Sequence, residues 1–303
     1  MKPQMAVMVP LVDLRSQPNT TPDTAAHDPL QETQLLYGER VRLIKQADGW
    51  AYVEATEQPE FTHGKRWQGY PGWLPASAIG SDKAFLPPNV VVTEAWAALW
   101  QDPTRLTPVE WRLPLGTRVF ATDLGGVLWR VELLDGSMVW MRRQDATPLA
   151  DLAGLSQTQR RERIVRQAGI LLGGRYYWGG RSPEAASASG QPTGVDCSAL
   201  VNLAYRAAGM DIPRDAHEQF MRAKPAGTLQ PADLIFLSAR EDPSRIVHVL
   251  LYAGQEEIIE GPGTGLAVRR MALRERFGRP LNELAPGTVI DGQTVSFGTY
   301  FKP

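Results

Sequence analysis

Gly194-Val195-Asp196-Cys197-Ser198-Ala199-Leu200, preceded by Tyr176-Tyr177-Trp178-Gly179-Gly180, contains the single cysteine of the chain. Beyond Asp196, apolar residues recur with the spacing of a helix face that packs on a core, and Gly209 then ends the pattern: Leu200, Leu203, Ala204, Ala207 and Ala208. Asp196 is therefore predicted to be the N-cap and Cys197 the first helical residue. Free N–H groups and the helix dipole stabilise a thiolate there, which predicts an activated nucleophile. The alternative is a small buried side chain with no chemical role.

A cysteine nucleophile needs a base, and His248 is the candidate among four histidines. It lies in the apolar run from Ile246 to Ala253, which predicts a strand covered on both faces. The preceding run from Asp233 to Leu237 is predicted to be its antiparallel neighbour. A buried imidazole must be hydrogen-bonded, so a purely structural histidine is the alternative. The other three histidines are expected in solvated loops or at a surface helix start: His27, His63 and His217.

A third polar residue, Glu260, follows in Ile258-Ile259-Glu260. With a hairpin turn near 254–256, this segment would return beside the strand that carries His248. The Glu260 carboxylate would then accept the Nδ1–H of His248 and orient the ring, as the third member of a catalytic triad does. A solvated glutamate at a strand end is the alternative.

In order, the motifs Y-x-W-G-G, D-C-S, P-R-D-x-x-x-Q (Pro213 to Gln219), D-L-I-F and H-V resemble those of the NlpC/P60 cysteine peptidases over about residues 157–303. The resemblance implies a papain-like fold that cuts bacterial peptidoglycan peptides, with Cys197 as nucleophile and His248 as base. Two positions depart from the family pattern. Ala199 replaces a usual glycine, and Glu260 stands where His, Asn or Gln is common. A carboxylate there would bias the ring of His248 toward imidazolium and alter the pH profile.

Composition limits the partners of the chain. A formal net charge of −1 argues against nucleic acid or an anionic surface as the main partner, and no apolar run is long enough to span a membrane. A single cysteine cannot form an internal disulfide, and no metal-binding motif or cofactor motif is present. No signal peptide is visible after Met1, so we expect a cytoplasmic monomer, or a secreted protein if a leader has been removed.

The first half of the chain predicts short antiparallel strands separated by turns such as Asp48-Gly49 and Asp135-Gly136. Two weak cycles of G-x-x-V, an aromatic-centred strand and a Trp-containing strand resemble bacterial SH3-like domains. The expected fold is α+β, with two small SH3-like β-barrels (1–82 and 83–150) before a papain-like catalytic domain (151–303). The predicted strands are Ala6–Leu14, Arg40–Lys45, Trp50–Glu54, Gly72–Leu74, Gly116–Ala121, Val127–Leu134 and Met138–Met141.

This arrangement is similar to that of γ-D-glutamyl-L-diamino acid endopeptidases, which act on muropeptides with a free N-terminal L-Ala. In that group the first barrel closes one end of the cleft. The resemblance implies that Glu39 and Tyr70 contact the substrate amine. It also implies that Tyr176, Asp196 and Ser198 hold the L-Ala-γ-D-Glu unit, with Arg214 and Asp215 nearby. Ala216 replaces a common serine, so one hydrogen bond to the substrate is expected to be missing.

The sequence therefore predicts a cysteine endopeptidase that hydrolyses the γ-D-glutamyl–diamino acid bond of peptidoglycan stem peptides without a metal or other cofactor. A catalytically weakened muropeptide-binding or cell-wall-binding protein is the alternative from another class, and Glu260 and Ala216 motivate it. An amidase or acyltransferase on the same scaffold is a further alternative. The sequence leaves open which diamino acid is accepted and what the Gly/Ala/Ser-rich segment 182–193 does.

Overall fold

The N-terminal part of the chain is an antiparallel sheet that begins at β1. The computed structural model describes residues 4–19, 27–81, 86–185 and 193–302. The predicted strand from Ala6 to Leu14 is two strands, because the chain turns at Pro10. The sheet has the order β3-β2-β6-β5-β4-β1-β7 and a short 3₁₀ helix η1. Its elements are β1 (Gln4–Val7), β2 (Leu11–Arg15), β3 (Gln31–Leu36), β4 (Arg40–Ala47), β5 (Trp50–Glu60), β6 (Gln68–Pro75), η1 (Ala76–Ala78) and β7 (Ile79–Gly80).

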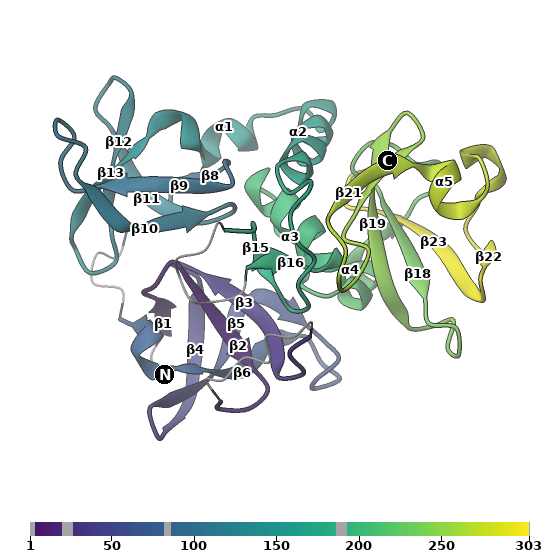
Figure 1. Cartoon of the computed structure of the whole chain (residues 1–303), viewed down its shortest axis with the longest axis horizontal. Coiled ribbons are helices and arrows are strands. Elements are labelled where there is room, and N and C mark those ends of the chain that lie inside the picture. Colours follow the sequence, from purple (N-terminus) through teal and green to yellow (C-terminus); the bar gives the residue numbers. More distant parts are fainter. Residues whose placement is uncertain (1–3, 20–26, 82–85, 186–192, 303) are drawn as a thin grey trace.

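A second antiparallel sheet follows, with the order β10-β9-β13-β12-β11-β8-β14. In Figure 1 the two sheets lie on the same side of the molecule, one above the other. Among the described residues, the end strands of each sheet are not paired with one another, so neither sheet forms the closed barrel that we expected. The elements are β8 (Val90–Val92), β9 (Trp96–Trp100), β10 (Pro108–Pro114), β11 (Arg118–Asp123), β12 (Leu128–Glu132), β13 (Met138–Arg142), η2 (Arg143–Asp145) and β14 (Ala146–Pro148).

The C-terminal part packs helices against a sheet with the order β17-β23-β18-β19-β20-β21, with β22 paired to β23. The predicted neighbours β18 and β19 are confirmed as an antiparallel pair. The helices are α1 (Leu149–Ala153), α2 (Gln157–Gly169), α3 (Cys197–Ala207), α4 (Ala216–Arg222), α5 (Leu273–Phe277) and η3 (Leu281–Glu283). The strands are β15 (Arg181–Ser182), β16 (Gly194–Val195), β17 (Lys224–Pro225), β18 (Leu234–Ser238), β19 (Ile246–Gly254), β20 (Glu257–Glu260), β21 (Arg269–Ala272), β22 (Val289–Ile290) and β23 (Gln293–Thr299).

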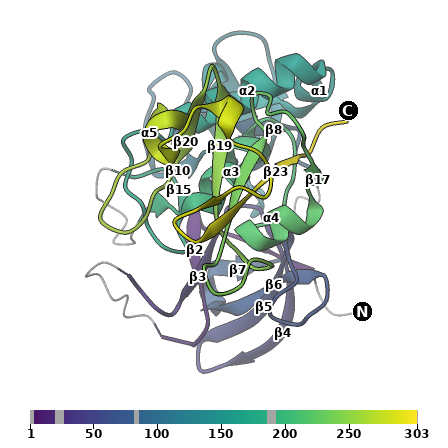
Figure 2. The ribbon, with the colours of Figure 1, turned by 90° about the vertical axis from the view of Figure 1, so that its right-hand side faces the viewer.

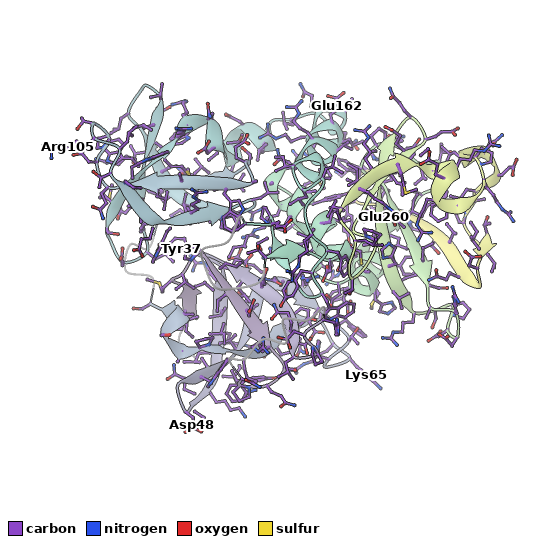
Figure 3. All side chains as sticks on the ribbon, viewed as in Figure 1. Tyr37, Asp48, Lys65, Arg105, Glu162 and Glu260 are labelled. Carbon is purple, nitrogen blue, oxygen red and sulfur yellow. The ribbon has the colours of Figure 1, made fainter. Side chains whose placement is uncertain are left out.

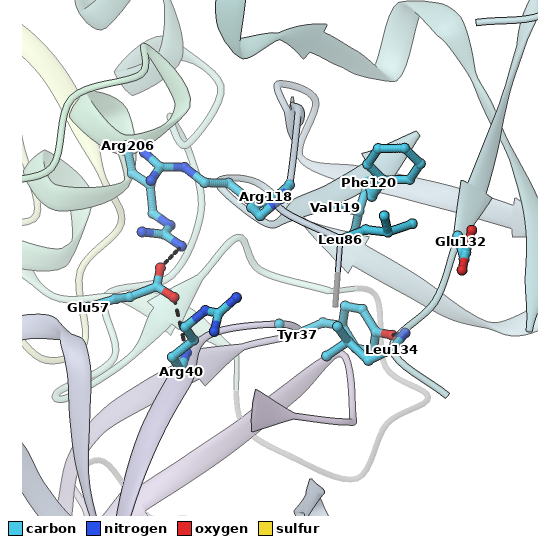
Figure 4. Close-up of a pocket in the computed structure, with 12 residues that line it drawn as sticks. Tyr37, Arg40, Glu57, Leu86, Arg118, Val119, Phe120, Glu132, Leu134 and Arg206 are labelled. Atoms are coloured by element: carbon cyan, nitrogen blue, oxygen red, sulfur yellow. Dashed lines mark hydrogen bonds and ion pairs between the residues drawn. The ribbon is translucent and has the colours of Figure 1, made fainter. Parts of the chain in front are cut away.

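The helix α3 lies at the centre of the molecule, between the two N-terminal sheets and the C-terminal sheet (Figure 1). All of its residues are buried, and its apolar face forms the main core together with β18 and β19. Its Arg206 side chain reaches the N-terminal part, where it donates to Glu57 Oε2 at 2.7 Å and to the Gly116 carbonyl oxygen at 2.9 Å. Figure 4 shows the small cavity at this junction, with Glu57 between Arg206 and the backbone of Arg40. The helix α3 is therefore tied to both N-terminal sheets.

The two N-terminal sheets also contact each other directly. Tyr37, labelled in Figure 3, packs into the core of the second sheet, and its hydroxyl accepts a hydrogen bond of 2.6 Å from the Leu134 N–H. Figure 2 shows α4 of the C-terminal part above β5 and β6 of the first sheet. Since Glu218 on α4 accepts from the Thr62 N–H at 3.0 Å, this approach is a real contact. No helix in the ranges that the structure covers is long and apolar enough to cross a membrane.

Candidate active site

Cys197 is the first residue of α3 and Asp196 is its N-cap, as the sequence predicts. The Asp196 carboxylate accepts the Ala199 N–H at 2.8 Å, which satisfies one of the donors at the helix start. The Cys197 thiol is largely buried. Its backbone N–H, at the first helical position, has no intrahelical partner and points along the positive end of the helix dipole. The site thus offers both a nucleophilic sulfur at the start of a helix and a donor for an oxyanion.

His248 and Glu260 lie on adjacent antiparallel strands, β19 and β20, and their side chains meet. His248 Nε2 donates to Glu260 Oε2 at 3.2 Å. The prediction that Nδ1 faces Glu260 is therefore wrong, and the ring presents its other nitrogen to the carboxylate. The predicted burial of the strand on both faces is also only partly right. Val247 is exposed and His248 is half-buried, because this end of β19 borders a cleft.

The electrostatics of this group favour an ion pair. Burial would lower the pKa of His248, but its hydrogen bond to Cys197 and the charges of Cys197 and Glu260 outweigh burial and raise that pKa to about 9. For Glu260, burial favours the neutral acid, yet hydrogen bonds from His248 and Arg269 and the charge of Arg276 lower its pKa to about 2. An imidazolium between the Cys197 sulfur and the Glu260 carboxylate can donate a proton to a leaving group, as a cysteine peptidase requires.

A cleft of about 510 Å³ runs over Cys197. Its walls come from the C-terminal part and from the first N-terminal sheet, which supplies Glu32, Thr62, His63 and Tyr70. Tyr176 and Trp178 line it beside the nucleophile, and Arg245 lines it from the loop between β18 and β19. Burial and the charges of Asp196 and Cys197 raise the pKa of Tyr176 above its usual range, so its hydroxyl keeps its proton.

Tyr70 lies where the first sheet meets the C-terminal part. Its hydroxyl donates to Asp215 Oδ2 at 3.0 Å and lies 3.4 Å from Glu32 Oε2. Burial, together with the charges of Glu218 and Asp196, raises the pKa of Asp215 to about 7, although Arg214 opposes this effect. Two carboxylates and a tyrosine hydroxyl therefore lie together at this end of the cleft, and their oxygen atoms could accept hydrogen bonds from a cation.

Asp196, Ser198 and Arg214 form a tight network. Arg214 is fully buried and donates to Asp196 Oδ2 at 2.7 Å and to Ser198 Oγ at 2.9 Å. It also donates to Thr33 Oγ1 on β3 at 2.7 Å. Asp196 and Ser198 line the cleft, as predicted for substrate contacts, whereas Arg214 does not line it and lies behind them. Arg214, which was predicted near the substrate, therefore supports the cleft wall from behind rather than lining the cleft.

Glu39 lies outside the cleft, which corrects the prediction that it contacts the substrate amine. Its side chain is fully buried and accepts from Arg181 Nη1 at 2.8 Å, with Arg206 Nη2 at 3.5 Å. Although burial opposes it, these two arginines lower the pKa of Glu39. The carboxylate of the first sheet that does reach the cleft is Glu32, which the sequence analysis missed. The predicted strand Trp50–Glu54 continues to Glu60 as β5, and its Gln58 side chain donates to Glu39 Oε2 at 2.9 Å.

Two histidines that we expected in solvated positions lie at the cleft. His63 Nδ1 lies 3.0 Å from Glu60 Oε2, and the ring packs edge-on against Tyr70. Its contact with Glu32 and the charge of Glu60 outweigh burial and raise the pKa of His63 to about 9. His217 Nδ1 accepts the Ile246 N–H at 3.2 Å. The local signal that could have found His63 is Glu60, three residues before it at the end of β5, whereas Glu32 on β3 comes close only through the fold.

Most of the Gly/Ala/Ser-rich segment 182–193 lies outside the described residues, so its predicted place beside the cleft is not described. Among the residues that the structure does describe, no group of three or more His, Cys, Asp or Glu side chains is arranged to hold a metal ion.

A thiol at a helix start, an imidazole and an orienting carboxylate in a cleft are the site of a cysteine peptidase. Residues 173–279 match the NlpC/P60 family.

Two curated relatives match most of the chain. The gamma-D-glutamyl-L-lysine dipeptidyl-peptidase of Bacillus subtilis is 28% identical over 82% of this chain and 78% of its own length. Dipeptidyl-peptidase 6 of Lysinibacillus sphaericus is 25% identical over 80% of this chain and 84% of its own. The crystal structure of an NlpC/P60 family protein from Bacillus cereus superimposes with a TM-score of 0.76 at 22% identity, covering 98% of this chain and 99% of that one. The last similarity shows that the whole fold, N-terminal sheets included, is shared.

Proposed function

We propose that this protein is an endopeptidase that hydrolyses the bond between γ-D-glutamate and a diamino acid in peptidoglycan stem peptides with a free N-terminal L-alanine. The names of the relatives support a peptidoglycan peptide as substrate, since two of them are called gamma-D-glutamyl-L-lysine dipeptidyl-peptidase and another is a peptidoglycan endopeptidase of Mycobacterium tuberculosis. The observation that carries the free amine requirement is the contact of Tyr70 with Asp215 and Glu32 at one end of the cleft.

In this proposal the substrate ammonium binds to the carboxylates of Glu32 and Asp215, and Tyr70 blocks any longer chain beyond it. Glycan-linked peptides carry an amide at this position, which has no positive charge and extends further. They would leave the two carboxylates without the ammonium as an additional partner, beside His63 and Arg214, and would clash with the tyrosine ring. Asp196 already accepts five hydrogen bonds, two of them from Arg214, so it is not the partner of the ammonium.

The chemistry follows from the triad geometry. The Cys197 thiolate attacks the γ-carbonyl carbon of D-glutamate, and the Cys197 N–H stabilises the oxyanion. When the C–N bond breaks, the His248 imidazolium gives its proton to the departing amine of the diamino acid. His248 then takes a proton from water, which hydrolyses the thioester and releases L-Ala-D-Glu.

Mass spectrometry of the tripeptide L-Ala-γ-D-Glu-diaminopimelate incubated with the protein tests this proposal, with the lysine tripeptide in parallel. Release of L-Ala-D-Glu is the expected result. An intact but tightly bound peptide would instead favour the binding protein, and the loss of a side-chain amide alone would favour an amidase.

The same proposal includes two SH3-like domains at 1–82 and 83–150, a catalytic domain at 151–303, and a monomer that recycles muropeptides in the cytoplasm. The seven-stranded antiparallel sheets support the SH3-like assignment. The boundaries, the oligomeric state and the location stay predictions.

A further inference from the structure

Glu260, labelled in Figure 3, has three cationic partners. Its side chain is completely buried, and both of its oxygens are shared. Arg269 donates from Nε at 3.0 Å and from Nη2 at 2.5 Å to Oε1. Arg276 donates from Nε at 3.1 Å to Oε2, the same oxygen that accepts from His248 at 3.2 Å. Arg269 thus binds Oε1 with two hydrogen bonds, whereas Oε2 accepts one hydrogen bond from Arg276 and one from His248.

The fold explains why these partners meet. Arg269 on β21 lies directly opposite Glu260 on β20 in the antiparallel register, so their side chains are cross-strand neighbours. Arg276 comes from α5, which follows β21 after a short connection. Both arginines keep part of their side chains in solvent, with exposures of 43% and 26%. Either arginine can be replaced while the buried Glu260 carboxylate keeps its other two cationic partners.

A lone buried carboxylate beside His248 would hold the proton of the imidazolium too strongly, because a desolvated anion with one counter-ion interacts strongly with it. His248 must release that proton to the leaving amine in every turnover. Two further cations on the carboxylate reduce its pull on the ring, and the grip on Oε1 keeps Oε2 aimed at Nε2.

We propose that Arg269 and Arg276 are positioning residues of the active site, which orient the Glu260 carboxylate and offset its charge so that it can align His248 without trapping the proton. Arg276 contributes more to offsetting the negative charge that His248 meets, because both side chains bond to the same oxygen, Oε2. Arg269 contributes more to fixing the orientation of the carboxylate, because it binds Oε1 with two hydrogen bonds. The proposal rests on the triad of the proposed function and extends it to residues outside that triad.

The direct test is NMR titration of His248 in the wild type and in Arg276→Gln, which needs no substrate. Arg276→Gln should raise the pKa of His248 by about one unit, the effect of changing one nearby charge. Arg276→Lys, which keeps the charge, should restore most of the wild-type value. The charged groups that face His248 and Glu260 are Cys197 on α3, Arg269 on β21 and Arg276 on α5, so no other neighbour in the described contacts accounts for such a rise.

Two controls isolate the effect. Arg274→Gln, on the same helix but exposed, and Arg270→Gln, which breaks the neighbouring pair with Glu257, should leave the pKa of His248 unchanged. In the Glu260→Gln background, Arg276→Gln should have a much smaller effect because no carboxylate remains to be offset. With peptide substrate, Arg276→Gln should lower kcat about tenfold, the loss of one charge-assisted hydrogen bond, and leave KM unchanged.

An unchanged or lowered pKa of His248 in Arg276→Gln overturns the proposal, and so does an equal shift in the Glu260→Gln background. If the protein cleaves no stem peptide but the titration behaves as expected, the proposed substrate is wrong and the role of the arginines stands.

Discussion

At the residue scale, the reactive centre depends on two local features. Asp196 caps α3, so that Cys197 starts the helix, and Glu260 returns on the next strand to meet the ring of His248. Both follow from short-range rules, an N-cap before an apolar helical stripe and a tight hairpin between strands. The turn of that hairpin has positive φ angles at Gly254, Gln255 and Glu256. The chemistry of the site therefore lies within two short segments of the chain.

The first prediction at this scale concerns the thiolate–imidazolium pair. Cys197→Ala should abolish turnover and leave peptide binding largely intact, since the change removes only the sulfur. Iodoacetamide should alkylate the wild type rapidly at pH 6, and His248→Ala should be clearly slower, because the thiolate loses its counter-ion. The single cysteine makes mass spectrometry of the intact protein a sufficient measurement. Equal alkylation rates for the wild type and His248→Ala would show that Cys197 and His248 do not form an ion pair.

The second prediction uses the raised pKa of Asp215, about 7. Below that pH the carboxyl is neutral and binds an ammonium poorly, whereas above it the carboxylate is charged. KM for a free-amine peptide should therefore fall as the pH rises from 6 to 7.5, before the α-amino group of the substrate loses its own proton near pH 8. Asp215→Asn should remove this dependence. A KM that stays constant over this range in the wild type would show that Asp215 does not bind the amine.

At the element scale, charged side chains buried between the elements connect the parts of the molecule. Glu39, in the turn before β4, pairs with Arg181 on β15 and with Arg206 on α3. Arg214, just before α4, reaches Thr33 on β3. These pairs lie away from solvent, so the loss of one partner leaves an uncompensated charge. They fix the first sheet against the catalytic helix, which is what gives the cleft its second wall.

The two glutamates of the first sheet give a matched pair of variants. Glu39→Gln should lower the free energy of unfolding by about 3–5 kcal/mol, the usual cost of breaking a buried ion pair on one side. It should leave KM close to wild type. Glu32→Gln should raise KM for free-amine peptides with little change in stability, because Glu32 lines the cleft and is partly exposed. Urea unfolding and steady-state kinetics on both variants provide the measurements. A raised KM in Glu39→Gln and a loss of stability in Glu32→Gln would show instead that Glu39 contacts the substrate.

The sequence predicted what local patterns determine and missed what the packing of distant elements determines. The helix start at Cys197 and the strands around His248 and Glu260 could be predicted because capping and hydrophobic patterns act within a few residues. Glu39 was assigned the place that Glu32 occupies, because nothing in the local sequence tells which glutamate is buried against an arginine of another part. Arg269 and Arg276 were missed for the same reason, since their significance depends on a strand register and a helix position.

At the scale of the whole molecule, the first sheet completes the active site. The catalytic part supplies the nucleophile, the base and the carboxylate of Asp215, while the first sheet supplies Glu32, His63 and Tyr70. The second sheet holds the first in place through Tyr37 and through Arg206 at their junction. We therefore expect the N-terminal part to act on specificity, as the proposed function requires, whereas a wall-targeting module would leave the cleft to the catalytic part alone.

The comparison of kcat/KM for L-Ala-γ-D-Glu-diaminopimelate and its N-acetylated form, on wild type and Tyr70→Ala, tests this central claim most directly. In the proposed function, acetylation removes the charge that Glu32 and Asp215 would bind. The loss of a charge-assisted hydrogen bond costs about 1.5–3 kcal/mol, so the wild type should cut the blocked peptide at least about tenfold more slowly. Tyr70→Ala should recover part of that loss, because it opens the end of the cleft without touching Cys197 or His248. If the wild type cuts both peptides equally fast, the first sheet does not select for a free amine and the account is contradicted.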